Sequence, residues 1–191
     1  METALVWFRT DLRVRDNHAL AAATEAERLC CVYCFDPRRF GSRDYGGTNS
    51  FRYEKTGGYR TRFLRESVAD LRTSLRELRS ELIVRHARPE TVVPELASAI
   101  DADFVSFQAA PTPEERAVER TVTARLKRIE TNPDVESFRD HTLYHPDDLP
   151  VPVARIEDTF TSFRRTVENS DAAVRPTVDA PSALPPNPEV A

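Results

Sequence analysis

A group of charged residues follows the first apolar segment of the chain. Residues 5–8 form a short run of strand-like composition, and Arg9, Asp11 and Arg13 come directly after it. A helical pattern begins near residues 17–23, so the segment predicts a strand, a polar loop and a helix, which is the first half of a βαβ unit. Ligands of such units gather at the carboxyl end of the strand, which makes these side chains candidates for ligand binding. Alternatively, the alternating charges form a salt-bridged corner that only fixes the turn.

A second group combines aromatic and basic residues over positions 38–58. Asp36 ends the preceding strand, Lys55 stands before Thr56-Gly57-Gly58, and Arg60 follows at the start of a helical pattern. Aromatic rings among arginines can stack on planar groups or hold phosphate, and glycines with a lysine before a helix can form an anion site. The spacing of a dinucleotide fingerprint or a Walker A motif is not present, so an ordinary dinucleotide enzyme is not indicated. The alternative is a solvated loop with a few anchoring aromatics.

The cysteines and histidines do not form a convincing metal site. All three cysteines lie in the apolar run 29–35, and Cys31 and Cys34 would point to opposite faces of a strand. His141 and His145 are four residues apart, but the proline that follows them argues against a helix that could bring them together. We therefore predict buried structural cysteines, loop histidines and no metal.

Length and composition predict one substantial domain. The chain has 191 residues, of which 40% are hydrophobic, and its net charge of -4 gives no global basic footprint for nucleic acid. No apolar run approaches the roughly 20 residues of a membrane span, and no secretory leader is recognisable. We therefore expect a cytoplasmic location and no membrane partner.

Five short apolar segments alternate with helical patterns along the chain. The predicted strands are 3–8, 29–35, 82–84, 104–107 and 135–138. The helices are expected at 16–26 with Asp16 as N-cap, at 64–78, from Pro89, from the capping box Thr112 to Glu115, and at 156–167, whereas 38–58 is expected to be a long loop. This alternation predicts an α/β fold with a doubly wound, Rossmann-like five-stranded parallel sheet and helices on both faces.

Four segments resemble a known family. Residues 7–20, WFRTDLRVRDNHAL, are similar to the N-terminal signature of the photolyase/cryptochrome family. Residues 55–72 resemble the cryptochrome-DASH type specifically, and HTLYHPDDLP at 141–150 resembles its TMYHxDDLP segment with Leu143 in place of methionine. Thr161, Phe163, Arg164, Val167 and Glu168 also match that type. The resemblance runs from residue 5 to about 178.

The resemblance implies one domain of a larger protein. Members of the family have an N-terminal α/β domain that can hold a light-harvesting antenna. Their larger helical domain holds FAD and damaged DNA for light-driven repair of pyrimidine dimers, or serves blue-light sensing. We expect residues 1–169 to be the α/β domain and the proline-rich residues 170–191 to be an interdomain linker that ends before the helical domain. The chain alone is then non-catalytic, and DNA is reached only through the helical domain, so its own role would be to dock that domain and possibly to hold an antenna.

The resemblance also directs attention to an antenna site. Folate-binding relatives carry a glutamate in the loop after the fourth strand, where this chain has Ala110, which argues against folate. Relatives with a deazaflavin or flavin antenna place it in the crevice at the strand ends. The candidate crevice residues are Arg9, Asp11, Arg13, Asp36, Lys55, Arg60, Gln108 and Ala110. Two alternatives are the small subunit of a split photolyase and a stand-alone nucleotide-binding module.

Overall fold

The main sheet is parallel throughout. The computed structural model describes residues 3–45 and 51–189. Five strands follow the order β5-β2-β1-β6-β7, and each neighbouring pair is parallel. Their bounds are β1 Thr3–Phe8, β2 Arg28–Cys34, β5 Leu82–Arg85, β6 Phe104–Gln108 and β7 Asp134–Phe138. The predicted five-stranded, doubly wound parallel sheet is confirmed.

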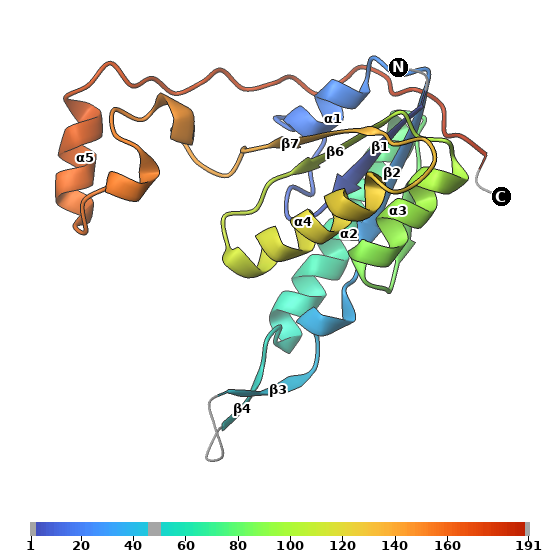
Figure 1. Ribbon diagram of the computed structural model, residues 1–191, viewed down its shortest axis with the longest axis horizontal. Coiled ribbons are helices and arrows are strands. Elements are labelled where there is room, and N and C mark those ends of the chain that lie inside the picture. Colours follow the sequence, from blue (N-terminus) through green and yellow to red (C-terminus); the bar gives the residue numbers. More distant parts are fainter. Residues whose placement is uncertain (1–2, 46–50, 190–191) are drawn as a thin grey trace.

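Helices cover both faces of this sheet (Figure 1). The four helices are α1 His18–Ala23, α2 Gly58–Glu77, α3 Pro89–Ala99 and α4 Pro113–Leu126. Side chains of α1 and α2 belong to one buried cluster, and side chains of α3 and α4 belong to the other. Successive residues of the central strand β1 alternate between the two clusters, with Val6 on one side and Leu5 and Trp7 on the other. This alternation explains why β1 is apolar along its whole length, as expected for a parallel strand covered on both faces.

The start of α1 differs from the prediction by one residue. Asn17, not Asp16, is the N-cap, and its side-chain oxygen accepts a hydrogen bond from the Leu20 amide at 2.9 Å. Asp16 lies in the left-handed region, with φ of 51°. The side-chain amide of Asn17 also donates to Asp11 Oδ2 at 3.1 Å, which ties the helix start to the loop after β1. The helix ends at Ala23 and is shorter than predicted.

The segment after β2 is not the long irregular loop that its composition suggested. A short 3-10 helix, Pro37–Arg39, precedes two antiparallel strands, β3 Ser42–Tyr45 and β4 Phe51–Glu54, which pair only with each other. These strands lack the continuous apolar runs that marked the strands of the main sheet. β3 is mostly polar, and aromatic and charged residues alternate in β4, which is a composition that also suits a loop.

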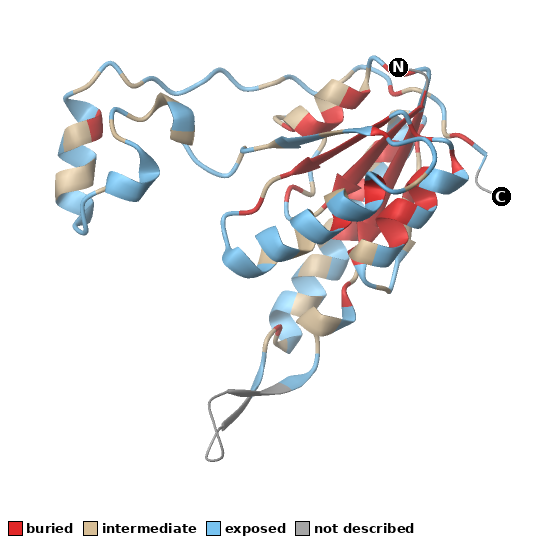
Figure 2. Ribbon diagram, viewed as in Figure 1, coloured by how far each residue is buried: buried red, intermediate tan, exposed pale blue. Residues whose placement is uncertain are grey.

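Beyond β7 the chain leaves the sheet and forms an arm, residues 139–175 (Figure 1). It contains two 3-10 turns, Pro146–Asp148 and Val153–Arg155, and the helix α5 Phe160–Glu168, which begins later than predicted. The arm is largely exposed, in contrast to the buried sheet (Figure 2). Within residues 3–45 and 51–189, no helix combines the length and apolar character that crossing a membrane requires.

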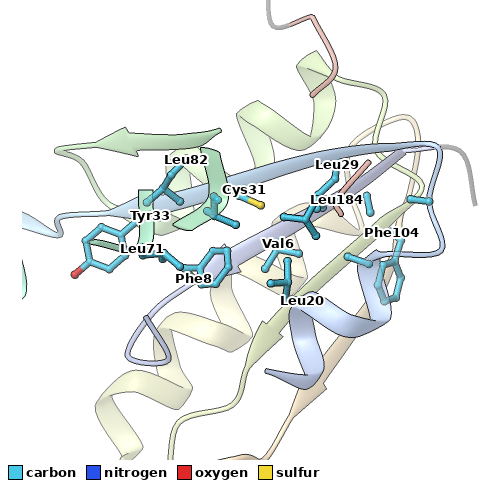
Figure 3. Close-up of a cluster of buried hydrophobic side chains, with 14 of the residues drawn as sticks. Val6, Phe8, Leu20, Leu29, Cys31, Tyr33, Leu71, Leu82, Phe104 and Leu184 are labelled. Carbon is cyan, nitrogen blue, oxygen red and sulfur yellow. The ribbon is translucent and has the colours of Figure 1, made fainter. Parts of the chain in front are cut away.

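The proline-rich tail, residues 176–189, returns along the sheet domain in an extended conformation. Leu184 is buried and joins the cluster around Leu29 and Val6 (Figure 3). The Leu184 amide donates to the Leu78 carbonyl at 3.2 Å, and the Leu29 amide donates to the Pro186 carbonyl at 3.0 Å. The tail is therefore packed against the domain by both apolar and backbone contacts.

We expect Leu184→Ala to lower the free energy of unfolding by about 2–3 kcal/mol, because it removes a buried side chain from the core and leaves a cavity. Urea unfolding followed by circular dichroism measures this difference. Leu143→Ala is the matched control, because Leu143 is exposed and should cost less than about 0.5 kcal/mol. Equal costs for the two variants would show that the tail contributes nothing to the core.

We expect Asn17→Asp to destabilise the protein in a pH-dependent way. The substitution places a second carboxylate beside Asp11, whose pKa burial already raises. One of two adjacent buried carboxyls must take up a proton, and their folded-state pKa is raised above the unfolded value. The free energy of unfolding of the variant should be about 2–3 kcal/mol lower than that of wild type at pH 8. This difference should shrink toward pH 5 as protonation relieves the repulsion. Urea unfolding at both pH values tests this, and a deficit that is the same at pH 8 and pH 5 would contradict it.

Candidate ligand crevice

A crevice of about 300 Å³ opens at the carboxyl ends of β1 and β2, where doubly wound sheets commonly bind ligands. Its floor is apolar and consists of Trp7, Phe8, Tyr33 and Cys34. The starts of α2, α3 and α4 supply further walls. An apolar floor with aromatic rings and a polar rim suits a flat organic ligand.

The rim carries more basic than acidic groups. Five basic side chains line the crevice, namely Arg9, Arg38, Arg39, Lys55 and Arg60, against the three acidic side chains of Asp36, Glu114 and Glu115. Three of the five basic groups, Arg9, Arg38 and Lys55, already form ion pairs with carboxylates. The other two, Arg39 and Arg60, make no ion pair among the described residues and supply the positive charge that is left for a ligand. The crevice therefore favours an anionic ligand.

Asp36 and Arg38 form a fixed pair on the rim. Arg38 Nε donates to Asp36 Oδ1 at 3.0 Å, and Arg38 Nη2 donates to Glu90 Oε2 at 2.8 Å. Burial alone would raise the pKa of Asp36, but the hydrogen bonds from Arg38 outweigh burial and hold that pKa below its usual range. Asp36 therefore acts as a fixed carboxylate that positions the Arg38 guanidinium.

Arg9 is held in place from several sides. Its Nη1 donates to the Gln108 carbonyl at 2.9 Å and forms an ion pair with Glu119, and its guanidinium lies 4.6 Å from the centre of the Trp7 ring. Glu119 Oε1 also accepts the Ala110 amide at 2.7 Å. Glu119 was not among the candidates from the sequence, although an acidic residue beside the apolar stripe of a predicted helix was the available signal.

Lys55 and Arg60 differ in whether they already form an ion pair. Lys55, at the end of the β3–β4 hairpin, forms an ion pair with Glu114 at the start of α4, so the two connect opposite walls of the crevice. Arg60 also lines the crevice, and in the part of the chain that the structure describes it makes no ion pair. Arg39 likewise lines the crevice without an ion pair among the described residues, but it is partly buried, so the exposed Arg60 is the more accessible of the two to a ligand.

The eight candidates from the sequence separate into two sets. Arg9, Asp36, Lys55 and Arg60 line the crevice together. The remaining four, Asp11, Arg13, Gln108 and Ala110, do not line it. The sequence allows either a salt-bridged corner or a ligand site after β1, and the loop in the structure combines a fixed turn with a crevice wall.

Contacts within the loop after β1 explain why Asp11 and Arg13 do not line the crevice. Asp11 is buried and accepts hydrogen bonds from the Arg9 amide at 3.1 Å and from Asn17. Burial raises the pKa of Asp11, against these hydrogen bonds, which lower it. Arg13 is exposed and donates to the Asp16 carbonyl. Both residues stabilise the turn.

The surroundings of Gln108 and Ala110, at the end of β6 and in the loop after it, explain why these two residues do not line the crevice. Gln108 is buried, and its side chain accepts the Thr10 hydroxyl at 3.4 Å. Ala110 borders a separate hollow that is also lined by Arg116, Arg120 and Arg139. Residues 109–111 of the loop after β6 therefore face a different cavity from the one that Trp7 and Arg60 share, and only Thr112 at the end of this loop lines the crevice.

The cysteines are structural. All three are buried and free, and Cys31 and Cys34 belong to clusters on opposite faces of the sheet, as predicted. Burial raises the pKa of Cys34 to about 12, so its thiol on the crevice floor is neutral at pH 7 and is not a nucleophile. Among the described residues, no group of three or more His, Cys, Asp or Glu side chains is arranged to hold a metal ion.

Comparison with known sequences gives consistent relatives. Residues 4–186 match the DNA photolyase family. The chain is 47% identical to a cryptochrome DASH of Gloeobacter violaceus, covering 99% of this chain and 36% of that protein. It is also 47% identical to a cryptochrome DASH of Natronomonas pharaonis, covering 97% of this chain and 37% of that protein. The chain therefore spans a little over a third of the length of these relatives.

Solved structures agree with this result. A cryptochrome of Synechocystis superposes over the whole chain with a TM-score of 0.90 and 35% identity, and the match covers 38% of that protein. An archaeal photolyase of Sulfolobus tokodaii, solved with two FAD molecules, shares the fold with a TM-score of 0.76 and 21% identity over 95% of this chain and 37% of that protein. The resemblance in the four sequence segments is thus confirmed, and the chain belongs to the DNA photolyase family, in which it corresponds to the N-terminal α/β part of cryptochrome DASH proteins.

Proposed function

We propose that this chain docks the FAD-binding helical part of a cryptochrome-DASH-type protein and holds a deazaflavin or flavin antenna in the crevice at the ends of β1 and β2. The single observation that carries the antenna proposal is the pairing of an aromatic floor with a positive rim. Light-driven repair or blue-light sensing would belong to the whole protein, with FAD in the helical part.

The residues present fit a flat, anionic chromophore. Trp7, Phe8 and Tyr33 offer apolar and aromatic surface, and Arg60 and Lys55 stand where a ribityl or phosphate group could be bound. The bound chromophore would supply light absorption and energy transfer. The chain's own residues would orient the ring system, exclude water from its floor side and neutralise its charge.

A folate antenna is the less favoured candidate. The position expected to carry a glutamate is Ala110, which has no carboxylate to accept hydrogen bonds from a pterin. The nearby carboxylate of Glu119 is already engaged by Arg9 and by the Ala110 amide. The cavity beside Ala110 therefore lacks an available carboxylate on the loop after β6.

The arm supports the docking proposal. Four of its large hydrophobic side chains are exposed, namely Leu143, Val153, Phe160 and Val174. Several large apolar side chains left exposed on one projecting segment are typical of a surface that another part covers. Relatives extend far beyond the matched region and could supply that cover. A stand-alone nucleotide-binding module would leave these side chains in water.

We expect Arg60→Gln to weaken binding of FMN and of a 5-deazaflavin by about tenfold, because the variant removes a charge-assisted contact in the crevice. Titration of the chain, followed by flavin fluorescence and Trp7 quenching, measures this. Arg13→Gln is the matched control, since Arg13 is exposed outside the crevice, and it should bind as wild type does. The antenna proposal fails if neither chromophore binds, or if the two variants lose affinity equally.

We expect Phe160→Asp to impair docking, because it places a charge at the most exposed of the large hydrophobic positions of the arm. A chimera that continues this chain with the C-terminal remainder of the Gloeobacter violaceus relative provides the test. The FAD content of the purified chimera and the temperature at which FAD is released should both fall in the variant. Phe63→Asp, at an exposed position on α2, is the control and should leave both values unchanged. Unchanged FAD retention in Phe160→Asp would remove the arm from the docking surface.

A further inference from the structure

Three of the four side chains on the crevice floor can be oxidised. The floor consists of Trp7, Phe8, Tyr33 and Cys34, and an indole, a phenol and a thiol are among the side chains that most readily give up an electron. A flavin-type chromophore that has absorbed light is a strong one-electron oxidant. An electron donor beside it therefore quenches the excited state before the energy can be passed on, unless that donor resists oxidation.

Trp7 is the strongest donor of the three, and a positive charge lies over its ring. The carbon at the centre of the Arg9 guanidinium is 4.6 Å from the ring centre. Loss of an electron would turn the indole into a cation, and two positive charges at this separation repel each other. Water screens this repulsion little, because Trp7 is 3% exposed and the Arg9 side chain is 9% exposed. Arg9 therefore makes Trp7 harder to oxidise.

Contacts of the Arg9 guanidinium keep its charge over the ring. Nη1 donates to the Gln108 carbonyl at 2.9 Å and pairs with Glu119, which also accepts the Ala110 amide. Glu119 offsets part of the field, but it pairs with one nitrogen of the guanidinium, and the guanidinium is the charged group that contacts the ring. The guanidinium also covers one face of the indole, so a chromophore cannot stack on that face.

Tyr33 and Cys34 resist oxidation for a different reason. Burial raises the pKa of each of them to about 12, so both keep their protons at pH 7. A neutral phenol or thiol gives up an electron far less readily than a phenolate or a thiolate does. The indole of Trp7 is neutral already and can give up an electron without losing a proton. Its protection must therefore come from a neighbouring charge.

We propose that Arg9 protects the excited state of a flavin-type antenna in the crevice by suppressing electron transfer from Trp7. This inference rests on the antenna site of the proposed function. In the suppressed step one electron passes from the indole to the light-excited ring system, and no bond forms or breaks and no proton moves. The same electron then returns to the indole, and the energy is lost as heat. Arg9 acts through Trp7, so in this role it is a positioning residue.

The fluorescence lifetime of FMN bound to the whole 191-residue chain tests the proposal. The lifetime of the bound chromophore does not depend on the fraction bound, so a loss of affinity cannot imitate quenching. The double variant Arg9→Met/Glu119→Gln removes the charge without leaving an unpaired carboxylate, and its lifetime should be about threefold or more shorter than that of wild type. Arg9→Lys keeps a positive charge and should retain most of the wild-type lifetime.

Further variants assign the quenching to Trp7. Adding Trp7→Phe to the double variant should restore the wild-type lifetime, because a phenyl ring is not a donor, whereas adding Tyr33→Phe should not. Trp7→Phe alone should change the lifetime little, because Arg9 already restrains the indole. This single variant keeps the Arg9–Glu119 pair, so it tests the proposal even if the double variant does not fold.

Two results would overturn this inference and leave the antenna site in place. One is FMN binding with the same lifetime in wild type and in Arg9→Met/Glu119→Gln. The other is a much longer lifetime in Trp7→Phe than in wild type, which would show that Trp7 quenches the chromophore despite Arg9. Absence of FMN binding by the wild-type chain would instead remove the flavin antenna, and this inference with it.

Discussion

Burial of β1 on both faces is the constraint on which the rest of the structure depends. A strand covered by helices on both sides must be apolar at every position, and its polar groups are displaced into the loop that follows. Arg9 and Asp11 lie in that loop, directly after Phe8, the last residue of β1. The same burial thus provides the two cores and the aromatic floor of the crevice, because Trp7 and Phe8 end the buried strand.

Charged groups in the loop after β1 are divided between fixing the backbone and facing the crevice. Asp11 holds Asn17 and the Arg9 amide, so it determines where the Arg9 side chain begins. Glu119 and Trp7 then determine where that side chain ends. A ligand in the crevice would therefore meet a wall that is already ordered, which lowers the entropic cost of binding.

The sequence was informative where a single local pattern dominates. Apolar segments predicted four of the five strands of the main sheet, the shorter and less apolar segment 135–138 was also correctly assigned as a strand, and the capping box Thr112 to Glu115 predicted the start of α4. It was uninformative where distant segments decide. The β3–β4 hairpin has no apolar run, and Glu119 becomes a partner of Arg9 only through the fold. Leu184 is one leucine in a proline-rich tail, and its burial depends on the cluster against which Leu78 also packs. Four of the eight candidates do not line the crevice for a related reason, because being near the end of a strand does not determine the direction of a side chain.

The arm leaves the body and returns to it at almost the same place. Asp140 accepts the His18 amide at 3.3 Å where the arm begins, and the Asp16 amide donates to the Val178 carbonyl at 2.7 Å just after the arm ends. Arg175 also forms an ion pair with Asp148, which joins the outgoing and the returning segments of the arm. The arm is therefore a loop closed at its base by the residues that precede and begin α1. A chain tethered at both ends samples far fewer conformations than a free tail of equal length. The arm would therefore lose less conformational entropy when a docking partner orders it.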